Sequence, residues 1–201
     1  MMDMQEKFLV IDWNKFMELT IALAHQIQLS GYMPDVVVAI LRGGYFVAKL
    51  VCDILDLETI ATLEIKFYKG IMEKAERPIV IHPITIDLRD KKTLIVDDVA
   101  DSGRTLQVAM DLVRLHGAKE VRTATLFFKP WSITMPDYYV EQTDKWIVFP
   151  WELGETLRNL SKELGNLEEA SKVLNLHTKY GDEVVRRLIK LIEKVGNRGK
   201  A

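Results

Sequence analysis

The sequence predicts an α/β fold in which a doubly wound, mostly parallel sheet is followed by a helical C-terminal extension. Two patterns lead to this fold class. As far as residue 128, short apolar runs rich in β-branched residues alternate with segments of helical periodicity. Beyond Glu152 the composition changes to helix formers. We therefore expect a sheet domain over residues 1–160 and a helical extension over residues 161–201, packed on that domain or on a partner subunit.

A helix and a β-α-β unit account for the first third of the chain. Asp12 is a suitable N-cap for a helix that runs to about Leu29, because apolar residues recur there at three- and four-residue steps. The continuous apolar run from Val36 to Leu41 is typical of a strand buried on both faces of a parallel sheet. A glycine-rich turn then begins a second helix that ends near Leu55, and a strand follows at about residues 59–66.

A charged segment, residues 67–77, separates this unit from the later elements and is expected to be an exposed connection that could close as a lid. A further helix is predicted over residues 105–115, and further strands are predicted at residues 79–86, 93–96, 121–128 and 146–149. Near the C-terminus, Asp182 begins an amphipathic helix whose apolar stripe needs a partner surface. The members of that stripe are Val184, Val185, Leu188, Leu191, Ile192 and Val195, and the opposite face carries Arg186, Arg187, Lys190 and Lys194.

Composition and charge exclude several classes of protein. No apolar run approaches the roughly 20 residues that a membrane-spanning helix needs, and the first residues lack the pattern of a secretory signal. The single cysteine, Cys52, allows neither an internal disulfide nor a CxxC zinc site, and we expect it in the core. The net charge of -2 shows no basic excess that would indicate nucleic-acid binding. We expect a cytoplasmic protein without a membrane partner.

The segment from Thr93 to Thr105, TLIVDDVADSGRT, carries the chemistry. An apolar strand runs into Asp97 and Asp98, at the end of the strands where open α/β sheets bind their ligands. The following turn places a glycine, two hydroxyl groups and several backbone N–H groups at the start of a helix, where partial positive charge favours a phosphate. Two adjacent carboxylates suit the hydroxyls of a sugar and a Mg²⁺ ion. Since the Walker pattern is absent, the segment indicates a sugar-phosphate site rather than an ordinary P-loop.

Val96 to Thr105 resembles the phosphoribosyl-diphosphate signature of the type I phosphoribosyltransferases. The resemblance implies that Asp97 and Asp98 hold the ribose hydroxyls and a nearby metal ion. It places Asp101 beside N7 of a purine as the candidate general base. It assigns the 5′-phosphate to Ser102, Gly103, Arg104 and Thr105.

The turn Leu41-Arg42-Gly43-Gly44 is similar to the pyrophosphate loop of the same family. Its glycines, Gly43 and Gly44, let the backbone approach the diphosphate, and Arg42 adds positive charge. Tyr68 and Lys69 occupy the place of the mobile catalytic loop of the family. The Ser-Tyr pair of close relatives is replaced here by Phe67-Tyr68.

Two later segments resemble the purine end of the xanthine-guanine and hypoxanthine-guanine enzymes, namely Phe127-Phe128-Lys129-Pro130 and Trp146 to Glu152. The resemblance places Lys129 at O6 of the base and Trp146 on its face, and it counts Ile147 among the substrate-binding residues. Lys129 can only donate hydrogen bonds, so it suits a 6-oxo group and disfavours the 6-amino group of adenine. Glu152 and Arg158 have the spacing of an acid and an arginine that serve a second magnesium and the pyrophosphate in these enzymes.

These residues lead us to expect a purine-salvage transferase that needs Mg²⁺, held by Asp98 and Glu152. It would join guanine, hypoxanthine or xanthine to phosphoribosyl diphosphate, with Asp97, Asp98 and Asp101 as catalytic residues, and it would act as a homo-oligomer, a dimer or a tetramer. One alternative is a regulator that senses phosphoribosyl diphosphate and binds nucleic acid through the cations of the last helix. Another is an adenine or orotate transferase, which would share the central signature but not Lys129 and Trp146.

Overall fold

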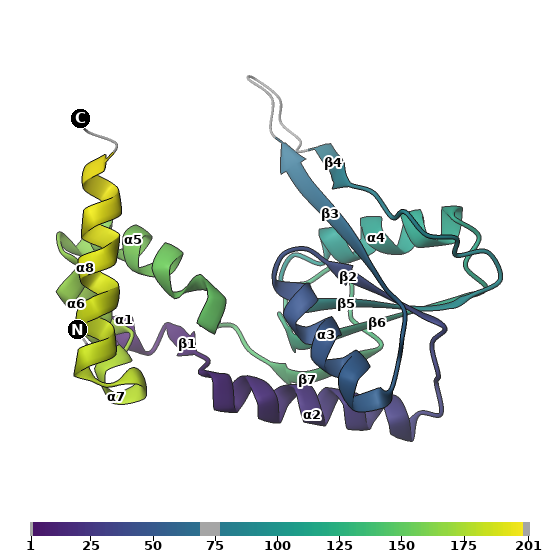
Figure 1. The fold of residues 1–201 in the computed structure, drawn as a ribbon, viewed down its shortest axis with the longest axis horizontal. Helices are drawn as coiled ribbons and strands as arrows, with labels where there is room; N and C mark the ends of the chain where they lie inside the picture. Colours follow the sequence, from purple (N-terminus) through teal and green to yellow (C-terminus); the bar gives the residue numbers. More distant parts are fainter. Residues whose placement is uncertain (1, 69–76, 199–201) are drawn as a thin grey trace. The chain divides into compact units, whose positions relative to one another are not determined.

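The computed structural model describes residues 2–68 and 77–198 (Figure 1). The contacts between residues divide the chain into two compact units. We call residues 17–144 the sheet unit, and residues 1–16 together with 145–201 the helical unit. The division into a sheet domain over residues 1–160 and a helical extension over residues 161–201 stays a prediction. None of the helices in the described ranges is long and apolar enough to cross a membrane.

Six strands form the sheet of the sheet unit, in the order β4-β3-β2-β5-β6-β7. All neighbouring strands run parallel except β3 and β4, which are antiparallel. The predicted α/β class with a mostly parallel sheet is therefore confirmed. The strands are β2 (Val36–Ile40), β3 (Ile60–Tyr68), β4 (Arg77–His82), β5 (Lys92–Ala100), β6 (Glu120–Phe128) and β7 (Tyr138–Gln142).

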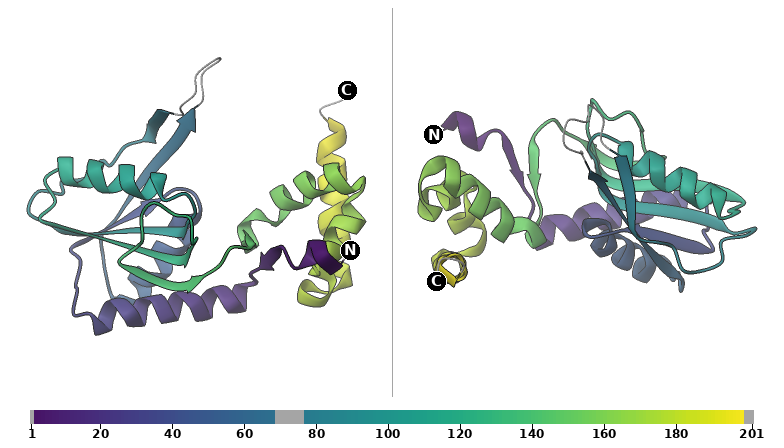
Figure 2. Two further views of the ribbon diagram at one scale, coloured as in Figure 1. Left: turned by 180° about the vertical axis from the view of Figure 1, so that it is seen from behind. Right: turned by 90° about the horizontal axis from the view of Figure 1, so that it is seen from above.

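Helices cover both faces of this sheet. Helix α4 (Arg104–Leu115) lies on one face, and α3 (Gly43–Leu55) and α2 (Trp13–Leu29) lie on the other (Figures 1 and 2). The predicted N-cap is present, because Lys15 donates its backbone N–H to Asp12 Oδ1 at 2.8 Å. All five residues of β2 are buried, as expected for a central parallel strand with helices on both sides. Cys52 is buried in α3, and burial raises the pKa of its thiol to about 11, so it is a core residue.

Three strands of the sheet unit differ from the prediction. Strand β5 extends beyond the predicted residue 96 because its pairing with β6 continues to Ala100 and Phe128, so Asp97 and Asp98 lie within the strand. Strand β4 is shorter than predicted and pairs with β3 as an exposed edge strand. Strand β7 was not predicted. It is short and contains Glu141 and Gln142, which hide the apolar pattern of a strand.

The helical unit contains a second, two-stranded sheet. Strand β1 (Phe8–Val10) pairs in parallel with β8 (Trp146–Val148). The strand at the start of the chain was not predicted, whereas the strand at residue 146 was. The helices are α1 (Met2–Gln5), the short 3₁₀ helix η1 (Pro150–Glu152), α5 (Leu153–Leu164), α6 (Leu167–Val173), α7 (Leu176–Tyr180) and α8 (Asp182–Arg198).

Helix α8 buries only part of its predicted apolar stripe. Of the predicted stripe, Val185 and Ile192 are buried in the core of the helical unit, together with residues of α5, α6 and α7, and so is Ile189, which the predicted stripe did not include. Val184 and Leu191 are 56% and 62% exposed. The reason is geometric, because each residue turns the helix by about 100°, so that neighbours such as 184 and 185 lie on different faces.

Candidate active site

Three turns meet at the C-terminal ends of neighbouring parallel strands in the sheet unit. The turn Arg42-Gly43-Gly44 follows β2, the turn from Asp101 to Thr105 follows β5, and Lys129 follows β6. Strand β5 lies between β2 and β6, with Ala39 paired to Val96 and Ala100 paired to Phe128. The fold thus brings residues from three distant stretches of sequence to one edge of the sheet, where such folds bind ligands.

Gly44 is the point at which the first turn touches the acidic pair. A Cβ atom at this position would lie 2.6 Å from the carbonyl oxygen of Val96, 2.8 Å from Cα of Asp97 and 3.0 Å from Oδ1 of Asp97. These distances are too short for any side chain, so only glycine allows the start of α3 to approach β5 this closely. The candidate diphosphate loop and the candidate sugar-binding acids are therefore direct neighbours.

Asp97 and Asp98 lie in the last part of β5. Asp97 is half-buried and its Oδ1 accepts the backbone N–H of Asp98 at 2.9 Å, while Asp98 is only 8% exposed. In the described ranges, no three His, Cys, Asp or Glu side chains are grouped so that they could hold a metal ion by themselves. Two carboxylates fit a Mg²⁺ ion that takes its other ligands from substrate phosphates and water, which is the usual situation for this ion.

The turn after β5 has the geometry of a phosphate cradle. Gly103 has a φ of +76° and is the N-cap of α4, where no side chain caps the helix, so the partial positive charge of the helix N-terminus faces the turn. The Ser102 hydroxyl accepts the backbone N–H of Arg104 at 3.4 Å, which draws the turn together. A Cβ at Gly103 would overlap Ser132 Oγ and would lie 2.6 Å from the backbone nitrogen of Thr134. A second loop is therefore packed tightly against the cradle.

Phe67 supports one of the predicted phosphate ligands. The Arg104 guanidinium carbon lies 4.4 Å from the centroid of the Phe67 ring, a cation–π contact that orients the cation. The phenylalanine that stands in place of the serine of the Ser-Tyr pair therefore contacts Arg104. Tyr68, the last residue of β3, is 56% exposed and available for contact with a ligand. Lys69 lies outside the described residues.

Lys129 is held at the end of β6 next to the cradle. Its backbone N–H donates to the carbonyl of Ala100 at 3.1 Å, and its side chain is only 5% exposed. Burial lowers the pKa of Lys129, while the charges of Asp101 and Asp144 oppose that shift. A cation is thus placed beside the candidate general base, in surroundings that remove much of its water.

Trp131 was not singled out in the sequence, yet it contacts both of these groups. Its indole Nε1–H donates to Asp101 Oδ1 at 2.9 Å. The Lys129 ammonium lies 5.4 Å from the centroid of its ring. The sequence offered one signal, namely a tryptophan two residues after the predicted purine-binding lysine, just beyond the end of a predicted strand.

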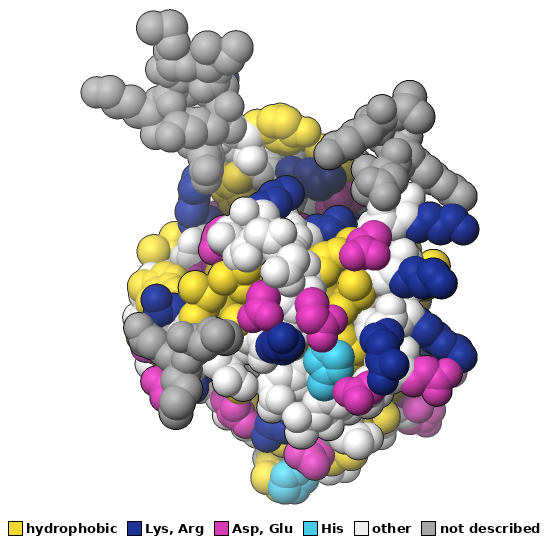
Figure 3. All heavy atoms as spheres, turned by 90° about the vertical axis from the view of Figure 1, so that its left-hand side faces the viewer, with side chains coloured by type: hydrophobic (Ala, Val, Ile, Leu, Met, Phe, Trp, Pro, Cys, Tyr) yellow, Lys and Arg dark blue, Asp and Glu magenta, His cyan; other side chains and the backbone are white. Residues whose placement is uncertain are grey.

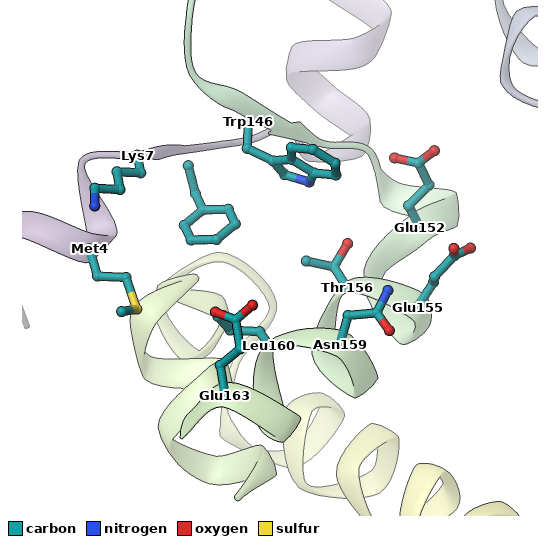
Figure 4. A pocket seen from close by; sticks show the side chains of 10 residues that line it. Met4, Lys7, Trp146, Glu152, Glu155, Thr156, Asn159, Leu160 and Glu163 are labelled. Carbon is teal, nitrogen blue, oxygen red and sulfur yellow. The ribbon is translucent and has the colours of Figure 1, made fainter. Parts of the chain in front are cut away.

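The other predicted site residues belong to the helical unit. Trp146 is 64% exposed and, with Glu152, lines a pocket of about 530 Å³ in which Thr156 and Asn159 of α5 face the indole (Figure 4). Ile147 is buried, with only 8% of its surface exposed. Arg158 lies in α5, one turn after Gly154.

One further arrangement in the helical unit has the order of a nucleophile, a base and an acid. His177 Nε2 is 3.1 Å from Ser171 Oγ, and His177 Nδ1 is 2.9 Å from Asp182 Oδ1. Ser171 is fully buried and its hydroxyl donates to the carbonyl of Glu168 at 2.8 Å, so no substrate can reach it. This network joins α6, α7 and α8 and is structural.

Comparison with known proteins agrees with the site. Residues 10–156 match the family model described as the phosphoribosyl transferase domain. The chain is 34% identical over 158 residues to the xanthine-guanine phosphoribosyltransferase of Cereibacter sphaeroides, which covers 74% of this chain and 89% of that protein. The crystal structure of a purine phosphoribosyltransferase from Pyrococcus horikoshii Ot3 is 40% identical with a TM-score of 0.66, covering 72% of this chain and 93% of that one. The Helicobacter pylori xanthine-guanine-hypoxanthine phosphoribosyltransferase, at 23% identity, shares the fold with a TM-score of 0.64, covering 77% and 99% of the two chains. The matched residues include the three turns at the edge of the sheet, and on this basis the chain belongs to the phosphoribosyl transferase family.

Proposed function

We propose that the protein transfers the phosphoribosyl group of phosphoribosyl diphosphate to a 6-oxopurine, giving the nucleoside 5′-monophosphate and pyrophosphate. The observation that carries this proposal is the placement of Lys129 beside Asp101, at the edge of the sheet that also holds the glycine turn and the phosphate cradle. A 6-oxopurine presents O6 and N7 along one edge. Lys129 can donate to O6, while the Asp101 carboxylate can accept an N–H at N7.

The protein's own residues mainly fix the reactants in line. The residues from Ser102 to Thr105 bind the 5′-phosphate, and the turn from Arg42 to Gly44 binds the diphosphate. The bond from C1′ to the diphosphate oxygen breaks, its electron pair leaves with pyrophosphate, and purine N9 forms the new bond to C1′. Asp101 takes up the imidazole proton that the base must lose.

Asp97 and Asp98 would hold the sugar hydroxyls and a Mg²⁺ ion, which, when bound, supplies positive charge that stabilises the departing diphosphate. The half-buried carboxylate of Asp97 beside Gly44 supports this assignment, because it lies between the sugar-binding and diphosphate-binding turns. The predicted roles of Trp146 in stacking, of Ile147 in substrate binding, of Glu152 as a metal ligand and of Arg158 at the pyrophosphate rest on the resemblance of their segments. The predicted homo-oligomer, dimer or tetramer, stays a prediction.

The alternative of a nucleic-acid-binding regulator is not favoured. Lys and Arg side chains gather over α8 on the face of the helical unit that Figure 3 shows. Arg186 pairs with Asp182 and Arg187 with Glu183, each one helical turn away, which is typical of a solvated helix surface. A sensor that only binds phosphoribosyl diphosphate would also have no use for the buried Lys129.

A panel of purines tests the proposed function directly. With Mg²⁺ and phosphoribosyl diphosphate, we expect guanine, hypoxanthine or xanthine to be converted far faster than adenine, as followed by absorbance. Chelation of the metal with EDTA should abolish the conversion, and added Mg²⁺ should restore it. Activity on adenine alone, or on none of the four bases, would contradict the proposal.

Replacement of Lys129 tests the purine end separately. Lys129→Ala removes a charged donor and should weaken guanine binding by roughly 1.5–3 kcal/mol, or about 10- to 150-fold, with little effect on the KM for phosphoribosyl diphosphate. Adenine should lose less, so the ratio of guanine to adenine activity should fall. Because burial lowers the pKa of Lys129, the KM of the parent for guanine should also rise more steeply at alkaline pH than that of the variant.

Lys119→Ala is a matched control for this experiment. Lys119 is exposed and directly precedes β6, whereas Lys129 directly follows it, so the two lysines lie at opposite ends of one strand. The control should keep the kinetics of the parent. An unchanged ratio of guanine to adenine activity in Lys129→Ala would remove Lys129 from the purine site.

A further inference from the structure

We propose that Trp131 is a positioning residue that orients the Asp101 carboxylate toward N7 of the purine and the Lys129 ammonium toward O6. This inference rests on the proposed function, because it concerns the two groups assigned to N7 and O6. It adds a residue to which neither the sequence motifs nor the comparisons assign a role.

The contact with Asp101 fixes one oxygen of the carboxylate. Trp131 Nε1–H donates to Asp101 Oδ1 at 2.9 Å, and the other oxygen is left to accept an N–H of the base. An indole N–H can donate but cannot accept a proton. Trp131 therefore orients the proposed base without competing for the proton that the base must take up.

The contact with Lys129 works through the face of the ring. The ammonium lies 5.4 Å from the ring centroid, within the range of a cation–π interaction. Lys129 is 5% exposed, so this aromatic face supplies part of the stabilisation that water would otherwise give. One side chain thus touches both groups, through its N–H and through its π face.

The loop that carries Trp131 is fixed to the phosphate cradle. The Ser132 N–H donates to the carbonyl of Lys129 at 3.0 Å, and the Ile133 N–H donates to the carbonyl of Ser102 at 3.1 Å. Gly103 packs closely against the backbone of Thr134. Trp131 is 54% exposed, but its backbone is held on both sides, as positioning requires.

The decisive variant is Trp131→Phe, which removes the indole N–H and retains an aromatic face. Loss of a hydrogen bond to a charged group should lower kcat by about tenfold, with the KM for phosphoribosyl diphosphate unchanged. Met135→Leu is the control, because Met135 is 62% exposed in the same stretch of chain. It should retain the kcat of the parent, and thermal melts should show that all variants are folded.

A double-mutant cycle with Asp101→Asn separates positioning from a general structural role. If Trp131 acts through Asp101, adding Trp131→Phe to Asp101→Asn should lower turnover no further. Independent, multiplying losses would overturn the proposal, as would an unchanged kcat in Trp131→Phe alone. Full activity of Asp101→Asn would overturn both the role of Asp101 and that of Trp131. A large loss in Asp101→Asn with none in Trp131→Phe would overturn the role of Trp131 alone.

Discussion

Asp101→Asn is expected to lower turnover with guanine or hypoxanthine by about 100-fold or more, the scale of lost general base catalysis. The asparagine has nearly the same shape and can still accept the indole N–H of Trp131, so the cradle should keep its geometry. Phosphoribosyl diphosphate should therefore bind almost as tightly as to the parent. Steady-state kinetics, with calorimetric titration of phosphoribosyl diphosphate, measures both quantities.

Asp90→Asn is the matched control for this substitution. Asp90 is exposed in the turn before β5, at the opposite end of the strand from Asp101, and has a φ of +60°, which asparagine tolerates as well as aspartate. Its turnover should equal that of the parent. Unchanged turnover in Asp101→Asn would remove Asp101 from the catalytic residues.

Gly44→Ala should damage stability and activity together. The added methyl group would lie 2.6 Å from the carbonyl of Val96 and 2.8 Å from Cα of Asp97, so α3 must move away from β5. Overpacking of this kind costs about 1–3 kcal/mol in the free energy of unfolding. The displacement separates the diphosphate turn from the acidic pair, and a misplacement on the order of 1 Å can cost about 100-fold in rate.

Gly154→Ala shows what the same substitution does where there is room. Gly154 lies in helix α5, and a Cβ there would meet only the Arg158 guanidinium, at 3.5 Å or more. Alanine favours a helix over glycine by about 1 kcal/mol, so the melting temperature should stay or rise. Equal melting temperatures and equal kcat/KM for Gly44→Ala and the parent would show that the close approach at Gly44 is not required.

The parts of the fold that rest on local patterns were predictable. The helix after Asp12, the buried strand from Val36 and the cradle after Asp98 follow from capping, β-branched runs and a glycine with two hydroxyls beside it. The parts set by distant contacts were not. Strand β7 is defined by its pairing with β6, and β1 by its pairing with β8, and neither segment has enough alternation to stand out alone.

The same division applies to the site. Asp97, Asp98 and Asp101 are carried by one contiguous motif, so the sequence indicates them directly. Trp131 acquires its role only because the loop after β6 folds back on Ser102, a contact between residues 31 positions apart. In the sequence, Phe67 was only a departure from the Ser-Tyr pair of the family. In the structure, its ring makes a cation–π contact with Arg104.

The pairing of β1 with β8 also sets the order in which the chain can fold. Residues 17–144 form a continuous stretch, so the sheet unit can complete its hydrophobic core while later residues are still being synthesised. The helical unit needs Phe8 and Trp146 side by side, which closes a loop of well over a hundred residues. Folding of the sheet unit first shortens the flexible part of that loop, which lowers the chain entropy that is lost when the loop closes. The phosphate cradle should therefore form on the nascent chain before the helical unit is assembled.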